Sequence, residues 1–191
     1  MTTDSTSETA TAAEIMLELV DDAGRTIGTA EKLSAHLPPG RPHRAFSVFL
    51  FDTRGRMLLQ RRAMSKYHSP GVWSNTCCGH PYPNEAPIAA AARRTYEELG
   101  AAPNRIEEGG TVRYDLPDPA SGLIEREFNH LFVGTVDAAM APDPDEVEDT
   151  RFVTAAELAE LREAPGSEFS VWFPTVLDAA LPAIRRLTGA W

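Results

Sequence analysis

Short apolar runs separated by polar turns dominate the first third of the sequence. Residues 15–20 and 26–30 flank the sequence Asp-Asp-Ala-Gly, and residues 45–51 and 57–60 flank Asp-Thr-Arg-Gly. Runs of this length that are bounded by Asp and Gly are typical of strands joined by tight turns. The pattern therefore predicts two β-hairpins.

The segment between the two predicted hairpins, residues 32–44, is rich in proline. Proline and glycine in close succession interrupt both helices and strands, so this segment is expected to be a loop. It contains His36 and His43. Two histidines in one loop make the segment a candidate for a functional site.

Helical patterns occupy the middle and the end of the chain. A run rich in Ala, Arg and Glu between residues 86 and 99 begins close to a proline and is followed by Gly100, which matches helix start and stop signals. Residues 154–157 form a capping box that predicts a short helix to about residue 162. A closing helix is expected at residues 173–187.

Two further strands are expected at residues 110–116 and 123–136. Strands, a helix, more strands and terminal helices are typical of an α+β protein, and the order favours an α/β/α sandwich with a mixed β-sheet. The chain has 191 residues, 42% hydrophobic and 24% charged, which fits one domain. We expect residues 14–191 to form that domain and residues 1–13 to be a disordered tail.

The charge distribution limits the classes of partner. A net charge of −10 and a pI near 4.9 would repel polyanions, so neither nucleic acid nor a membrane is expected to bind. Basic side chains nevertheless cluster between residues 54 and 66. This local excess of positive charge favours a small anionic ligand. We expect the protein to bind it as a monomer or a weak homodimer.

The cysteines and the N-terminus bear on the cellular compartment. Cys77 and Cys78 are adjacent, and a disulfide between neighbours would require a strained ring, so we expect free thiols in a reducing compartment. Residues 1–12 lack the basic start and apolar run of a signal peptide, and no apolar stretch reaches about 18 residues. These features favour a cytoplasmic protein.

A motif with defined spacing begins at Gly79. Together with Glu85 and the run RRTYEELGA from residue 93, it resembles the Nudix box, G-x5-E-x7-R-E-U-x-E-E-x-G-U. Arg94 stands where Nudix hydrolases have a metal-binding glutamate, which disfavours metal-assisted hydrolysis. Arg94 and Glu98 are instead expected to bind a diphosphate oxygen and Mg²⁺. Taken alone, such Arg–Glu pairs are also typical of a solvent-exposed helix face.

Two further segments indicate a particular family within the Nudix superfamily. RRAMSK (residues 61–66) and PGVWSNTCCGH (residues 70–80) resemble motifs of the type I isopentenyl-diphosphate isomerases of the Nudix superfamily. The likeness runs from about Lys32 to Trp172, although the proline that usually precedes this tryptophan is Val171 here. It implies a Nudix-type fold with a loop-helix motif, and a cytoplasmic enzyme of isoprene biosynthesis that interconverts isopentenyl and dimethylallyl diphosphate.

The resemblance also implies the residues of the site. The expected acid/base group comprises Cys78, Glu127 and Tyr114. One divalent ion, Mn²⁺, Zn²⁺ or Mg²⁺, is expected on His36, His43, His80, Glu125 and Glu127. The expected substrate-binding residues are Lys32, Arg62, Lys66, Arg94 and Trp172. Glu98 is expected to hold a Mg²⁺ that bridges the substrate diphosphate.

The chemistry of a homoallylic diphosphate requires two acid/base groups, because the substrate has no acidic C–H. One group must protonate the alkene and another must remove a proton. The resemblance assigns protonation to Glu127, assisted by Tyr114, and deprotonation to Cys78; which of Glu127 and Tyr114 delivers the proton stays open. The indole of Trp172 is suited to stabilise the intermediate carbocation.

Simpler explanations exist for single residues. A histidine in a proline-rich loop is commonly a surface residue, a Glu-x-Glu pair is commonly a solvated strand face, and free cysteine is commonly buried in a core, an explanation we keep for Cys77. His68 and His130 fall outside the pattern and are interpreted as structural or surface residues. A Nudix hydrolase is opposed by Arg94, and a non-catalytic binding module is opposed by the complete set of ligands and the thiol.

Overall fold

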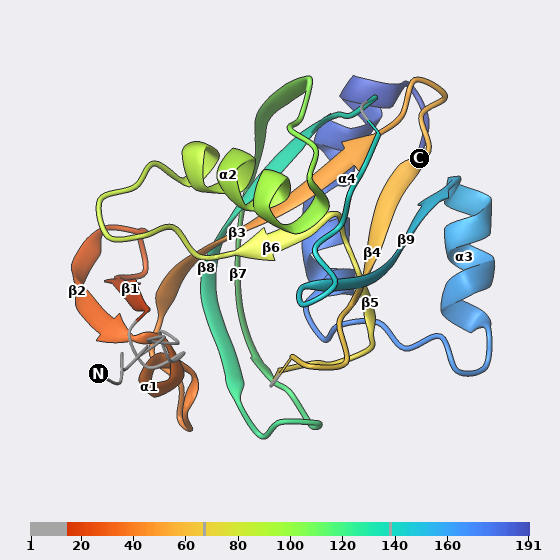
Figure 1. Ribbon diagram of the computed structural model, residues 1–191. Helices are drawn as coiled ribbons and strands as arrows, with labels where there is room; N and C mark the ends of the chain where they lie inside the picture. The colour runs from red at the N-terminus through yellow and green to blue at the C-terminus, as the bar shows by residue number, and fades with distance from the viewer. Residues whose placement is uncertain (1–14, 67, 138) are drawn as a thin grey trace, which may run out of the picture.

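In a computed structural model of the chain, strand β3 (His43–Phe51) lies at the centre of a mixed β-sheet (Figure 1). Its parallel neighbour is β8 (Ile124–Thr135), which pairs on its other edge with β7 (Arg105–Pro117) in antiparallel fashion. The parallel register sets His43 opposite Glu127. A candidate site residue from the proline-rich segment between the predicted hairpins is thereby fixed beside one from the second half of the chain.

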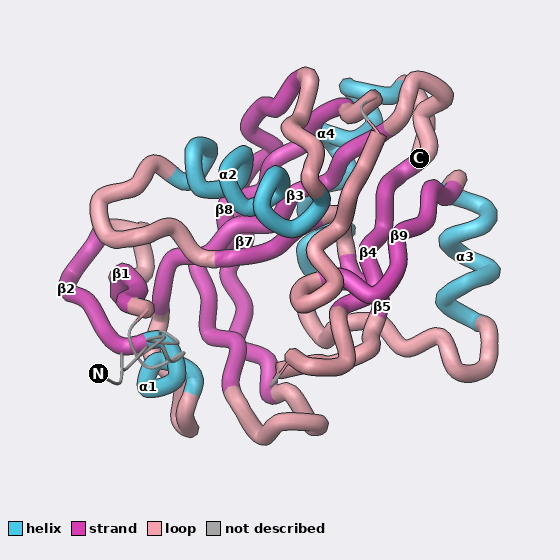
Figure 2. Tube along the Cα trace, in the orientation of Figure 1, coloured by secondary structure: helices cyan, strands magenta, loops and turns pink. Residues whose placement is uncertain are grey.

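The other strands of the described chain extend this sheet by antiparallel pairing. They are β1 (Met16–Val20), β2 (Thr26–Glu31), β4 (Met57–Arg62), β5 (Trp73–Ser74), β6 (Cys77–Gly79) and β9 (Val147–Val153). Strands β1, β4 and β6 pair directly with β3. Strand β2 pairs with β1, and β5 and β9 pair with β4 (Figure 2). The two predicted hairpins, β1–β2 and β3–β4, are both present.

Helices α2 (Pro87–Leu99) and α4 (Phe173–Thr188) cover opposite faces of the sheet (Figure 1). The alternation of side chains along β3 explains this arrangement, since successive residues of a strand point to opposite faces. Phe46 and Leu50 pack in the core cluster that includes α2, and Phe49 packs in the cluster that includes α4. The predicted α/β/α arrangement around a mixed sheet is confirmed.

The predicted loop at residues 32–44 is wrong at both ends, since β3 already begins at His43 and a helix occupies the start. Residues Lys32–His36 form the short helix α1, because the side chain of Glu31 accepts hydrogen bonds from the free backbone N–H groups of Leu33 and Ser34. The prolines that suggested a loop begin only after His36. This turn of helix brings His36 to a defined position.

The predicted capping box at Thr154 is confirmed and opens helix α3 (Ala155–Glu163). Strands β5, β6 and β9 were not predicted, because two are very short and β9 is largely polar.

The structure describes residues 15–66, 68–137 and 139–191, so the expected tail at residues 1–13 lies outside it. Among the described helices, none has the length and apolar character to cross a membrane.

The core beneath α4 gives a stability prediction. Ile184 is fully buried there, whereas Arg186 on the same helix is exposed. Ile184→Ala should lower the free energy of unfolding by about 2–5 kcal/mol, because it leaves a cavity in packed surroundings. Urea denaturation measures this change, with Arg186→Ala as the control, for which a change within about 0.5 kcal/mol is expected. A loss below about 1 kcal/mol in Ile184→Ala would contradict this packing.

Candidate active site

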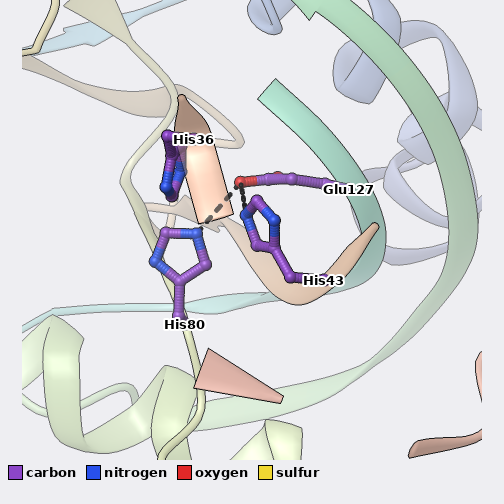
Figure 3. A group of neighbouring side chains, drawn as sticks. All are labelled: His36, His43, His80 and Glu127. Carbon is purple, nitrogen blue, oxygen red and sulfur yellow. Dashed lines mark hydrogen bonds and ion pairs between the residues drawn. The ribbon is translucent and has the colours of Figure 1, made fainter. Parts of the chain in front are cut away.

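Three imidazoles and one carboxylate from four parts of the chain converge on one point (Figure 3). His36 comes from the end of α1, His43 from the start of β3, His80 follows β6 and Glu127 lies on β8. One ligand atom from each lies within 4.8 Å of all the others. The Oε1 atom of Glu127 is 3.1 Å from His80 Nε2 and 3.6 Å from His43 Nε2.

Hydrogen bonds at the far side of two rings fix which nitrogen faces the cluster. His36 Nδ1 is 2.7 Å from the carbonyl oxygen of Lys32, and His43 Nδ1 is 2.8 Å from that of Arg41. A carbonyl can only accept, so each Nδ1 donates and each Nε2 keeps its lone pair. This arrangement is typical of histidines that bind metal ions through Nε2.

The cluster is suited to a divalent cation. His43 Nε2 is fully buried and has no hydrogen-bond partner among the described residues. Burial lowers the pKa of His80 to about 3, so its imidazole is neutral, which is the form that binds metals. Burial tends to raise the pKa of Glu127, but the imidazoles of His43 and His80 outweigh it and hold that pKa well below its usual range. The residues present therefore fit a metal site.

Glu125 lies at the edge of this cluster rather than within it. Strand alternation places Glu125 on the same face as Glu127, as predicted, and its Oε2 atom is 3.6 Å from His36 Nε2. The carboxylate is almost completely buried. Of the five residues expected to bind one metal ion, four form a compact group and Glu125 adjoins it through His36.

Tyr114 and Asn129 hold the other oxygen of Glu127. Tyr114 lies opposite Glu127 on the neighbouring strand and donates a short hydrogen bond to Oε2. Burial and the charge of Glu127 raise the pKa of Tyr114 well above its usual value, so the phenol keeps its proton. Asn129 donates to Glu127 Oε2 at 3.0 Å and to the Tyr114 hydroxyl at 2.9 Å. Sequence reasoning missed Asn129, although alternation from Glu125 and Glu127 would have placed it on this face.

The two cysteines point to opposite faces of the sheet. Cys77 is completely buried in the core beside α2, as predicted, whereas Cys78 is partly exposed. The Cys78 thiol donates to Asn75 Oδ1 at 3.1 Å and lies 3.6 Å from Ser47 Oγ. Burial raises its pKa to about 11. Asn75 is itself held by backbone carbonyls, including that of Val48, so the thiol has a fixed direction.

A cavity of about 340 Å³ connects these groups. Every sequence-predicted site residue except His43 lines it. One part of its lining consists of residues expected to act in catalysis or metal binding, namely His36, Cys78, His80, Tyr114, Glu125, Glu127 and Trp172. The residues of its charged part are Lys32, Arg62, Lys66, Arg94 and Glu98. The structure thus brings together residues that the sequence separates by up to 140 positions.

The charged part of the cavity contains one carboxylate that sequence reasoning missed. Glu146 forms an ion pair with Lys66 and lies 3.3 Å from Arg94, which also contacts Glu98 at 2.5 Å. Burial, and then repulsion by the neighbouring cations, lowers the pKa of Lys32. Such a concentration of positive charge stabilises a bound polyanion.

The two histidines outside the expected site differ in position. His130 lies on the strand face opposite Glu127 and contacts Arg44. His68, interpreted from the sequence as structural or surface, is 8% exposed and lines the cavity. Its ring centroid is 5.5 Å from that of Trp172. A lone histidine in a loop gave no sequence signal for this position.

Comparisons with known proteins define the class first. The NUDIX domain model matches residues 41–173, so the chain contains a NUDIX domain. A crystal structure of a Deinococcus radiodurans protein superposes with a TM-score of 0.69 at 18% identity, covering 86% of this chain and 98% of that one. A MutT NUDIX hydrolase from Burkholderia pseudomallei gives 0.55 at 21% identity, covering 72% and 97%. At these identities the structural likeness establishes the fold alone.

Sequence relatives define the family within that class. A protein of Streptomyces griseus named isopentenyl-diphosphate Delta-isomerase is 71% identical, covering 96% of this chain and 92% of the relative. A protein of Nocardia farcinica with the same name is 47% identical, covering 91% and 98%. The chain therefore belongs to the isopentenyl-diphosphate Delta-isomerase family.

The cluster geometry predicts how the protein binds a divalent ion. His43→Gln removes a buried Nε2 ligand, so the affinity for Zn²⁺ or Mn²⁺ should fall by more than about 100-fold, beyond the loss typical of outer-shell changes. Titration against a chromophoric chelator measures this affinity. His130→Gln, on the opposite strand face, is the matched control and should keep the affinity of the parent. Equal affinities for the parent and His43→Gln would contradict a metal site at this cluster.

Proposed function

We propose that the chain interconverts isopentenyl diphosphate and dimethylallyl diphosphate in isoprenoid biosynthesis. The observation that carries the proposal is the convergence of Cys78 and Glu127 on one cavity whose other part is lined by cations. A thiol and a carboxylate are the two acid/base groups that the reaction needs. The cations suit the diphosphate, which both substrates share.

The proton transfers follow from the bonding of the substrate. A proton added to the terminal alkene carbon leaves a tertiary carbocation, and loss of a different proton from the adjacent methylene creates the new double bond. Glu127, hydrogen-bonded by Tyr114, is assigned the first transfer, and Cys78 is assigned the second. Each forward turnover gives one proton from the Glu127–Tyr114 pair to the substrate and moves another from the substrate to Cys78, which accepts it as a thiolate. Exchange with water then returns both groups to their starting protonation states, and in the reverse reaction the two groups exchange roles.

The hydrogen bonds around Glu127 support this assignment. Oε2 accepts from Tyr114 and Asn129, while Oε1 faces the imidazoles. The phenol of Tyr114 holds a proton one hydrogen bond away from the carboxylate, so this proton can reach the alkene from Tyr114 directly or through Glu127. A divalent ion bound by the imidazoles, Mn²⁺, Zn²⁺ or Mg²⁺, would supply positive charge beside the carboxylate. We assign Glu125 to the same ion.

Trp172 and the cavity that it lines are assigned to the carbocation. The side chain of Trp172 is buried at the start of α4 and lines the cavity beside His68. An aromatic face stabilises positive charge, most strongly where water is excluded. Exclusion of water also prevents capture of the cation as an alcohol.

The diphosphate is assigned to Lys32, Arg62, Lys66 and Arg94. Arg62 has a second function, because its Nε and Nη2 atoms donate to the backbone carbonyls of Ser69 and His68. Glu98, which accepts a hydrogen bond from Gln60 at 3.0 Å, would hold a Mg²⁺ that supplies positive charge to the diphosphate. We expect the enzyme to act as a monomer or a weak homodimer in the cytoplasm, without nucleic acid or membrane partners.

A Nudix hydrolase is the main alternative, and position 94 opposes it. Hydrolysis by this fold needs clustered carboxylates on α2 to hold metal ions. Arg94 occupies one of those positions and forms ion pairs with Glu97 and Glu98. The hydrolase also leaves the oriented thiol of Cys78 without a role. A binding module without activity would need none of the acid/base groups.

The proposed reaction predicts a specific NMR result. Purified protein with isopentenyl diphosphate, Mg²⁺ and D₂O should form dimethylallyl diphosphate with deuterium incorporated into carbon. Cys78→Ala and Glu127→Gln should each lose at least about 10³-fold in kcat, since each removes one proton-transfer group. Cys77→Ala is the matched control and should retain most of the activity. Release of phosphate without isomerisation would favour the hydrolase instead.

A further inference from the structure

His68 lies between two buried carboxylates at the edge of the cavity. Its Nε2 atom is 2.7 Å from Glu125 Oε1 and 3.1 Å from Asp118 Oδ2. Both carboxylates are 3% exposed, and the imidazole is 8% exposed. A ring nitrogen this close to two carboxylate oxygens is attracted to both of them when it carries a proton, so the imidazole lies where it can hold either carboxylate in place.

Asp118 is itself held rigidly at the turn between β7 and β8. Its Oδ2 atom accepts from Ser69 Oγ at 3.1 Å and Ser121 Oγ at 2.7 Å, and its Oδ1 atom accepts from Ala120 N at 3.0 Å. Asp118 therefore joins two loops, the turn that precedes Glu125 and the segment that contains His68. A buried carboxylate with this many donors has little freedom to move.

The two oxygens of Glu125 face different partners. Oε1 faces His68, and Oε2 is 3.6 Å from His36 Nε2 in the metal-binding cluster. A carboxylate anchored at one oxygen presents the other in a fixed direction. Partners of this kind orient metal ligands and lower the cost of ordering them when the ion binds.

We propose that His68, held by Asp118, is a positioning residue that fixes Glu125 so that Oε2 faces the divalent ion. The inference rests on the proposed metal site and assigns a function to a histidine outside the expected ligand set. The backbone of the same segment accepts hydrogen bonds from Arg62 at 2.9 and 3.0 Å. Residues 68 and 69 thus connect a diphosphate-binding cation with a metal-binding carboxylate.

The test compares metal binding and kinetics in the parent, His68→Leu and His68→Gln. His68→Leu should weaken Zn²⁺ or Mn²⁺ binding by about 10–100-fold, measured against a chromophoric chelator, with a fall in kcat and little change in KM. His68→Gln keeps an N–H donor and should recover part of the affinity. His130→Gln is the control for loss of a histidine, and thermal unfolding without metal identifies any variant that fails to fold.

A double variant isolates the coupling to Glu125. If His68 acts through Glu125, His68→Leu added to Glu125→Gln should cause little further loss of metal affinity, because neighbouring effects are not additive. An affinity of His68→Leu within about twofold of the parent, with Glu125→Gln clearly weakened, would overturn the role of His68. If both Glu125→Gln and His68→Leu leave affinity unchanged, Glu125 is not a ligand and the inference is overturned as well. Absence of isomerisation by the parent is a separate result, which concerns the proposed function.

Discussion

The structure depends on the burial of one carboxylate, that of Glu127. An ionised carboxylate inside a protein is destabilising unless charge or hydrogen bonds compensate for the lost water. Here His43 and His80 lie beside one oxygen, and Tyr114 and Asn129 donate to the other. These four partners lie on different strands or loops. The folded structure must bring all of them to Glu127 to compensate its charge, which constrains how those strands and loops are arranged.

Strand register is what brings the partners together. The parallel pairing of β3 with β8 sets His43 beside Glu127, and the antiparallel pairing of β7 with β8 sets Tyr114 on the other side. A shift of one residue in either pairing would turn the side chains to the opposite face. The same alternation along β6 directs Cys77 into the core and Cys78 into the cavity. The core packing and the chemistry therefore depend on one set of registers.

The sequence predicted the chemical groups better than their surroundings. Arg94, Cys78 and the Glu-x-Glu pair stand in motifs whose spacing is preserved, and the cavity contains all of them. Glu146 and His68 could not be predicted, because each reaches the cavity through tertiary contacts between loops and has no local pattern of its own. Helix α1 was missed for a related reason, since one side-chain cap outweighs a proline-rich context.

If imidazoles and carboxylates bind the metal ion, the thiol of Cys78 stays free to transfer protons. X-ray absorption spectroscopy of the zinc-loaded protein tests this assignment directly. We expect a shell of nitrogen and oxygen at about 2.0–2.2 Å with the outer scattering of imidazole rings. A sulfur neighbour at about 2.3 Å, which would place Cys78 on the metal, or a shell without imidazole, would contradict it.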